Sequence, residues 1–173
     1  MKNYKNVLYV MFFLSFQAFS QSNKEFLELS SGFNRIGFYN DFAFKFEIKQ
    51  HQINLGLRHY TLDNFFEKNT VGMSVGYKYI IHAQNNKFYF YPGINANFFK
   101  ENKSIGQVFL SDFKLISGVG LNLNHKWSLF YQLGLGVVKT RSELVITEII
   151  TKVDYFNYEI ALGISYSFGD SSK

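Results

Sequence analysis

The feature that most constrains this 173-residue chain is a period of two that begins at Phe26 and continues to Phe168. Large apolar residues occupy alternate positions and small or polar residues lie between them, as in the segment FAFKFEI at 42–48. This spacing places the two residue types on opposite faces of a β-strand, whereas a helix repeats about every 3.6 residues. No segment after the first 20 residues sustains helical spacing. We therefore expect an all-β chain.

Eight segments of this kind fit between the two ends of the pattern. We expect strands at 26–37, 42–50, 52–61, 70–81, 87–99, 113–123, 127–138 and 155–168. Short polar turns are expected at 50–51, 82–86 and 124–126, long connections at 62–69, 100–112 and 139–154, and a short first outer connection at 39–41. Short turns at one end and long loops at the other are typical of an up-and-down barrel of the outer membrane. Pro92 lies inside a strand, and in a closed barrel it predicts a bulge or irregularity.

The composition of the two faces indicates which of them points outward. The apolar phase contains no Lys, Arg, Asp or Glu, while most of the 13 glycines lie in the other phase. A solvated exterior would be rich in Lys and Glu, and a narrow eight-stranded lumen favours small side chains. In hydrocarbon every backbone polar group must be paired, so a sheet can cross only as a closed barrel. We therefore expect lipid around the apolar face.

Aromatic residues gather at both ends of the segments. At the long-loop end they are Phe38, Tyr39, Phe42, Tyr60, Phe98, Phe99, Tyr155 and Phe156; at the short-turn end they are Tyr77, Tyr79, Phe88, Phe90, Trp127, Tyr166 and Phe168. A general preference of aromatic residues for strands explains their number but not their position. Two aromatic girdles around an aliphatic band are expected at the two membrane interfaces.

The first 20 residues have the layout of a secretory signal peptide. Lys2 and Lys5 precede an apolar run at 7–19, and small residues follow up to Ser20. The run is shorter than the roughly 20 residues that a membrane helix needs. We therefore expect residues 1–20 to be removed on export, and residues 21–173 to form a single outer-membrane barrel domain.

Residues 26–168 resemble the small eight-stranded outer-membrane barrels of Gram-negative bacteria, of the OmpX and OmpA-barrel type. The most specific segment is GISYSF at 163–168, where Gly163, Tyr166 and Phe168 match the terminal-strand signal that the barrel-assembly machinery reads in this family. The resemblance implies an eight-stranded antiparallel up-and-down transmembrane β-barrel in the outer membrane. It also implies a monomer that contacts membrane lipids, with the assembly machinery as a partner during biogenesis.

The inward phase also carries charged residues. They are Glu28, Lys45, Glu47, Lys49, Arg58, Lys78 and Glu159. Charges in a narrow lumen are costly unless they are paired, so we expect a network of ion pairs and hydrogen bonds that plugs the barrel. The alternative is a gate that rearranges to let ions pass, as proposed for the OmpA-type barrel.

No residue pattern points to catalysis, a cofactor or a metal. His51, His82 and His125 fall in the short turns, and the phase of His59 near the outer rim points toward lipid. The absence of cysteine excludes a thiolate site, and a net charge of +5, two of it in the leader, does not indicate nucleic acid as a partner. We expect a non-enzymatic protein without a cofactor. The alternatives are a lipid-modifying acyl hydrolase of the outer membrane and a soluble lipocalin-like barrel for an apolar ligand.

The segment 142–153, SELVITEIITKV, is unusually β-branched for a loop. It predicts either a protruding hairpin with a free edge or a loop folded back over the barrel mouth, and the sequence does not decide between them. A protruding edge would recruit an extracellular protein by strand addition. The expected role is therefore structural, adhesive or loop-mediated binding in the cell envelope.

Overall fold

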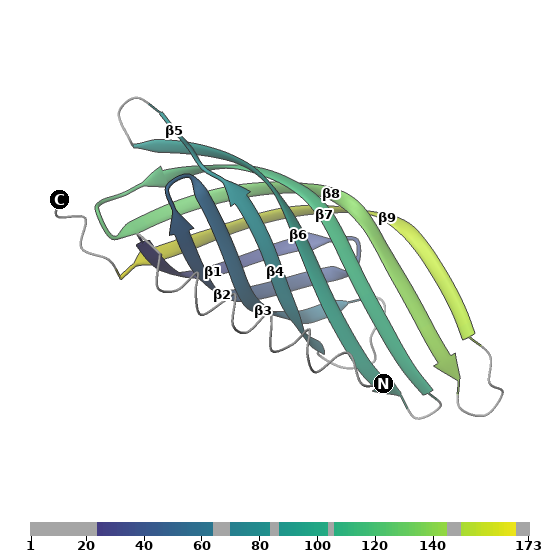
Figure 1. Ribbon diagram of the computed structural model, residues 1–173. Coiled ribbons are helices and arrows are strands. Elements are labelled where there is room, and N and C mark those ends of the chain that lie inside the picture. Colours follow the sequence, from purple (N-terminus) through teal and green to yellow (C-terminus); the bar gives the residue numbers. More distant parts are fainter. Residues whose placement is uncertain (1–23, 64–69, 84–86, 104–105, 145–149, 169–173) are drawn as a thin grey trace, which may run out of the picture.

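The computed structural model describes residues 24–63, 70–83, 87–103, 106–144 and 150–168, which form one antiparallel sheet. The strands are β1 (Lys24–Asn34), β2 (Gly37–Ile48), β3 (His51–Asp63), β4 (Thr70–Tyr79), β5 (Ile81–His82), β6 (Phe88–Lys103), β7 (Gly106–Asn122), β8 (Trp127–Leu144) and β9 (Ile150–Ser167). Apart from β4 and β5, strands adjacent in the chain pair with each other, β1 pairs with β9 and β4 pairs with β6, so the sheet closes on itself (Figure 1). Because β5 continues the line of β4, the nine strands occupy eight positions around the barrel. We call each of these positions a stave. The predicted fold class is confirmed.

The two rims of the barrel differ. β1 begins and β9 ends at one rim, where Phe26 pairs with Ser167, and we call this rim the terminal end. The opposite rim, where β8 turns toward β9, is called the hairpin end. The expected signal peptide at 1–20 lies outside the described residues and stays a prediction. In the described part of the chain, no helix has the length and apolar character needed to span a membrane.

Charged side chains lie inside the barrel and large apolar side chains lie outside. Lys45 is 3% exposed and Arg58 is fully buried, whereas Phe44 and Leu133 are 48% and 45% exposed. The exposed apolar residues on all eight staves form what we call the apolar belt: Leu29, Phe33, Phe42, Phe44, Ile53, Leu57, Val71, Met73, Ile94, Phe98, Phe113, Leu115, Leu133, Leu135, Val137, Phe156, Ile160 and Leu162. The face that the sequence pattern directs outward is therefore the exposed face.

The irregularity expected at Pro92 appears in the neighbouring stave. β4 pairs with β6 up to Lys78 and Gly93, and β5 resumes the pairing in the same register at Ile81 and Phe90. The pairing is interrupted between these points, opposite Pro92. Ile80 donates its backbone N–H to Gln50 O, in the turn before β3, at 2.7 Å, so the backbone N–H and C=O of the adjacent Tyr79 face Pro92 on the other side. Proline has no N–H to donate, so the ladder bond to Tyr79 is missing and the stave divides into β4 and β5.

The first hairpin is shorter than expected, and the predicted connection at 39–41 is wrong. β1 ends at Asn34 and β2 begins at Gly37, so residues 39–41 lie within β2. The Oδ1 atom of Asn34 accepts hydrogen bonds from the backbone N–H of Ile36 at 2.8 Å and of Gly37 at 3.1 Å. Asparagine side chains close tight turns in this way. The turn is set by one side-chain contact, which the alternating pattern does not reveal.

Four strands extend beyond the others at the hairpin end (Figure 1). The β6–β7 ladder continues to Lys103 and the β8–β9 ladder to Ile150, so the expected long connections at 100–112 and 139–154 are mostly strand. We call residues 100–103, 106–110, 139–144 and 150–155 the half-sheet. The sequence analysis missed these extensions because their outward residues are mixed polar and apolar, which weakens the period of two.

The half-sheet resolves the two alternatives for 142–153 in favour of the protruding hairpin, with residues 145–149 outside the described chain. On the side away from β8, β1 pairs with β9 only as far as Glu159. Beyond that point, Arg35 Nη1 donates to Phe156 O at 3.2 Å, and no described strand pairs with this edge from Ile150 to Asp154. β9 therefore has an open edge next to its tip.

Hydrogen exchange along this edge should alternate. Ser167 donates to Lys126 O on the β8 side and Phe168 donates to Glu25 O on the β1 side. Odd-numbered residues of β9 therefore bond to β8 and even-numbered residues face the open edge. We expect slow exchange for the amides of 151 and 153 and fast exchange for those of 152 and 154, measured by NMR in detergent micelles. Uniformly fast exchange throughout 142–153 would contradict the hairpin.

Candidate functional site

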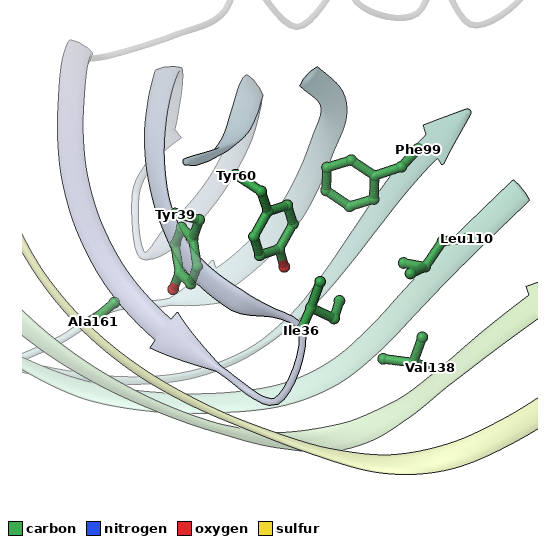
Figure 2. Close-up of a cluster of buried hydrophobic side chains, with 7 residues drawn as sticks. All are labelled: Ile36, Tyr39, Tyr60, Phe99, Leu110, Val138 and Ala161. Carbon is green, nitrogen blue, oxygen red and sulfur yellow. The ribbon is translucent and has the colours of Figure 1, made fainter. Parts of the chain in front are cut away.

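At the hairpin end the lumen is closed by a buried apolar cluster, which we call the cap (Figure 2). It consists of Ile36, Tyr39, Tyr60, Phe99, Leu110, Val138 and Ala161. The ring centroids of Tyr39 and Tyr60 are 5.7 Å apart, and those of Tyr60 and Phe99 are 5.1 Å apart. The Tyr60 hydroxyl accepts a hydrogen bond from Asn34 Nδ2 at 2.7 Å. Aromatic packing from several staves thus covers the polar interior at this end.

Four aromatic residues that were expected in the aromatic girdle at the long-loop end, here called the outer girdle, lie inside the barrel instead. Tyr39, Tyr60 and Phe99 belong to the cap, and Tyr155 packs against it. Each lies near the rim but in the inward phase of its strand, and side-chain direction in a strand follows phase rather than height. The remaining aromatic residues of that end, Phe38, Phe42, Phe98 and Phe156, are exposed on the outer face.

Below the cap, five charged side chains form what we call the central ionic cluster: Arg58, Asp41, Asp112, Lys114 and Glu159. Arg58 contacts Asp41 through two bonds, Nε to Oδ1 at 2.8 Å and Nη2 to Oδ2 at 2.7 Å. Its Nη1 atom donates to Glu159 Oε2 at 2.7 Å. Lys114 also pairs with Glu159, and its Nζ atom lies 2.6 Å from Asp112 Oδ2. The cluster therefore links β2, β3, β7 and β9 across the lumen.

Side-chain amides satisfy the remaining carboxylate atoms of this cluster. Asp112 accepts from Asn157 Nδ2 at 2.9 Å and from Asn97 Nδ2 at 3.1 Å, and Glu159 Oε1 accepts from Gln132 Nε2 at 2.9 Å. Buried charges are tolerated when they are both paired and hydrogen-bonded. Each carboxylate oxygen of Asp112 and Glu159 therefore has a partner, while Asn97 Oδ1 and the Tyr39 hydroxyl are the buried polar atoms of the described residues at this level without a hydrogen bond.

A second group, the lower ionic cluster, contains Glu28, Lys45 and Lys78. Glu28 pairs with Lys45, and its Oε2 atom lies 3.8 Å from Lys78 Nζ. The ammonium of Lys45 is 4.9 Å from the ring centroid of Phe130 and that of Lys78 is 4.6 Å from Tyr91, distances at which cation–π attraction operates. The central cluster has one carboxylate in excess and the lower cluster one cation in excess, so the two clusters balance.

Toward the terminal end the lumen widens into a hollow of about 660 Å³. Glu47 and Gln52 line it, and Gln52 Nε2 donates to Glu47 Oε2 at 3.2 Å. The hollow ends against Lys45 of the lower cluster. The interior is thus covered at the hairpin end, filled by ionic groups in the middle and open at the terminal end.

The structure buries six of the seven charged residues that the inward phase singled out. They are Glu28, Lys45, Glu47, Arg58, Lys78 and Glu159. Lys49 does not belong with them: it is exposed in the turn after β2, with a φ of 57°. The expectation for Lys49 is wrong because the strand, and with it the alternation, ends at Ile48.

Sequence reasoning missed three members of the central ionic cluster. Asp41 was assigned to a turn and Asp112 to a long connection, so neither was given a phase. Lys114 lies between the outward Phe113 and Leu115, and this alternation was a usable signal for an inward lysine. Extending the same alternation by two residues from Lys114 would have found Asp112 as well.

The four histidines lie in two places: His51, His82 and His125 lie at the terminal end, where His82 and His125 line the hollow, and His59 lies on the outer face. His51 Nδ1 lies 2.7 Å from the hydroxyl of Tyr77 at the terminal end. His59 lies on the outer face of β3, and its neighbours across the ladder are Asn40 and Val71. Among the residues that the structure describes, no group of three or more His, Cys, Asp or Glu side chains could hold a metal ion.

The terminal-strand segment places its three marked residues in β9 and just beyond it. Tyr166 packs against Trp127 with ring centroids 4.7 Å apart and against Phe168 at 5.3 Å, on the outer face of the terminal end. Gly163 faces inward, where an added Cβ would collide with the ring of Phe130. The two aromatics therefore lie on the outer face near the terminal rim, and the glycine makes room for a lumen side chain.

Replacing Arg58 should strongly destabilise the barrel. In Arg58→Gln, Asp41 loses both of its bonds from the guanidinium and Glu159 keeps only one of its two cationic partners. Removing one partner of a buried ion pair costs about 3–5 kcal/mol. We expect a loss of this size in the free energy of unfolding, measured by urea titration in lipid vesicles.

Lys49→Asn provides the matched control, since it also removes one positive charge and asparagine tolerates a positive φ. It should change the unfolding free energy by less than about 0.5 kcal/mol. Equal losses in the two variants would contradict the network.

A steady porin-size current through the wild type in planar bilayers would contradict the plug and favour the gate.

Three solved structures align with this chain over more than four fifths of its length. The N-terminal β-barrel domain of Pseudomonas aeruginosa OprF aligns with a TM-score of 0.54 at 10% identity, over 85% of this chain and 98% of that domain. Neisserial surface protein A (NspA) aligns with a TM-score of 0.49 at 13% identity, over 84% and 96%. A major outer membrane protein from Thermus thermophilus aligns with a TM-score of 0.49 at 17% identity, over 84% and 99%. No family model and no curated protein matches this chain.

Because the identity is only 10%, the similarity to the OprF barrel supports the fold alone. The closed antiparallel ladder of this chain is consistent with that fold. The chain has the fold of the small eight-stranded outer-membrane β-barrels, the group that its sequence resembles.

Proposed function

We propose that this chain is a non-enzymatic β-barrel of the outer membrane, with a structural or binding role in the cell envelope. The observation that carries the proposal is the apolar belt around a charged interior. Phe44 and Leu133 project outward while Lys45 and Glu159 are buried, an arrangement that water would penalise and acyl chains would stabilise. The belt continues around every stave, as a protein surrounded by lipid requires.

The interior supports a plug rather than a pore or a catalytic centre. The cap covers one end of the lumen, and both ionic clusters have their charges paired within it. His59, the histidine nearest the outer leaflet in this proposal, has Asn40 and Val71 as its ladder neighbours rather than a nucleophile or a carboxylate. Catalysis by nucleophile and base needs such groups within hydrogen-bond reach, so the geometry favours a non-enzymatic role.

Fractionation combined with gel mobility tests the location. The protein should sediment with outer membranes and require detergent for extraction, because the apolar belt must stay covered. The unboiled sample should migrate differently from the boiled sample, since a closed ladder resists detergent. Recovery as a detergent-free periplasmic protein would instead support the lipocalin-like alternative.

A charged residue introduced into the apolar belt provides a second test of whether lipid surrounds the barrel. Leu133→Arg should cost about 2–4 kcal/mol if lipid surrounds the barrel midplane. The substitution Lys139→Ala, six residues further along the same face of β8, should leave the unfolding free energy nearly unchanged. A neutral Leu133→Arg would contradict a lipid environment even if the protein pelleted with membranes.

The open edge of β9 provides the binding part of the proposal. We propose that an extended segment of an extracellular protein adds to β9 at residues 150–154, because unpaired N–H and C=O groups at a sheet edge template another strand. Lys152 and Asp154 aim their backbone groups at this edge. Their height above the belt makes the edge accessible from outside the cell in the proposed orientation.

Linear peptides selected from a random phage library on the reconstituted wild type test this edge. Asp154→Pro removes the N–H that faces the edge but leaves the bonds to β8, so it should abolish binding of strand-adding peptides. Asp154→Ala removes the carboxylate and keeps the N–H, so binding should persist. Equal binding to both variants, or loss with both, would contradict backbone-mediated addition.

A further inference from the structure

The outer face of the half-sheet carries a group of cations directly above the apolar belt. Lys100, Arg141 and Lys152 lie in one row across the sheet, in which Phe109 pairs with both Lys100 and Arg141 and Arg141 pairs with Lys152. Lys139 lies one row lower, two residues from Arg141 along β8. Diagonal and adjacent ladder neighbours are about 5–8 Å apart, so the four positively charged residues form one surface, which we call the basic patch.

Three of the four cations of the basic patch line a hollow, and the patch has an excess of positive charge. The hollow has a volume of about 720 Å³, and Phe109, Lys139, Arg141 and Lys152 contribute to its lining. Arg141 Nη2 pairs with Glu143 Oε1 at 2.7 Å, and the ladder puts Asp154 beside Lys139. Four cations against these two carboxylates leave two positive charges uncompensated.

An aromatic ring lies in the middle of the patch. The Lys100 ammonium is 5.2 Å from the ring centroid of Phe109, and the Arg141 backbone is the ladder partner of Phe109 on the other side. The ring offers an apolar surface between positive charges. Such a combination suits an anionic group attached to a ring, as in a phosphorylated sugar.

Among the described residues, the basic patch lies on one side of the rim. On the described staves β1 to β4, the outward positions near the hairpin end are Ser31, Phe33, Phe38, Asn40, His59 and Val71, none of them Lys or Arg. Arg35, in the first turn, is the cation that the structure describes there, and it is bonded to Phe156 O. A protein that is attracted nonspecifically to an anionic surface would carry cations around its whole rim. Cations on one side of the rim indicate a discrete binding site.

Directly below the patch, the same face of the same strands is apolar. Phe113, Val137 and Phe156 form the ladder row beneath Lys139 and are 41%, 44% and 57% exposed. A ligand that contacts both surfaces must have acyl chains and a negatively charged headgroup. We propose that this face of β7, β8 and β9 binds one phosphorylated glycolipid of the outer leaflet, with phosphate on Lys139, Arg141 and Lys152 and acyl chains on the belt.

This inference rests on the proposed membrane location. Native mass spectrometry of protein released from nanodiscs tests the glycolipid site. The nanodiscs contain equal amounts of bisphosphorylated lipid A and its dephosphorylated analogue. The wild type should retain the phosphorylated form, and K139Q/R141Q/K152Q should retain about a hundredfold less, at about fivefold for each cation removed. The control K49Q/K87Q/K126Q removes the same charge at the terminal end and should match the wild type.

The outcomes separate the proposals. Equal retention by the wild type and K139Q/R141Q/K152Q, or an equal loss in the control, would overturn the glycolipid site. Displacement of the lipid by millimolar inorganic phosphate would also overturn it, because the site would then recognise soluble phosphate. If the wild type neither enters nanodiscs nor shows heat-dependent gel mobility, the membrane location itself fails.

Discussion

In the proposed membrane location, the structure depends on one constraint, that backbone N–H and C=O groups surrounded by hydrocarbon must all be paired within the chain. The ladder is closed around most of the apolar belt, through the β1–β9 pairs up to Glu159 and the β4–β6 pairs up to Phe99. Beyond these pairs four strands continue as an open half-sheet, because water can satisfy an exposed edge. Closure and opening of one sheet thus separate a part whose backbone is fully paired from a part with an open edge.

The interior follows from the same closure. Eight staves leave a narrow lumen, and this chain fills it with two ionic clusters of opposite excess charge beneath an aromatic cap. Arg58 connects these levels: it bonds Asp41 and Glu159, and its guanidinium carbon lies 3.7 Å from the ring centroid of Tyr39. The filled middle of the lumen leaves the outer face and the rim as the surfaces on which the proposed functions rest.

Much of the fold followed from alternation, including the number of staves and the outward face, while the irregularity near Pro92 followed from the missing N–H of proline. Most of the errors are of one kind. Asp41 and Asp112 were assigned to connections, and Tyr39 was placed in the outer girdle by its height along the strand. These errors arise where the pattern weakens near the hairpin end, because a mixed outer face no longer marks the phase of the residues between, whereas the Lys49 error arises at the terminal end, where β2 stops at Ile48.

The sequence by itself determined the side-chain phase of each strongly patterned strand, and therefore which residues face outward and which face the lumen, because the direction of a strand residue depends only on its parity. The tertiary structure decided which buried charges meet, since Arg58 and Glu159 lie 101 positions apart and come together only across the closed barrel. It also decided that the described ends of 142–153 pair as strands and that four cations from three strands share one surface. These outcomes depend on strand register and stave height, which follow from pairing between distant segments rather than from local pattern.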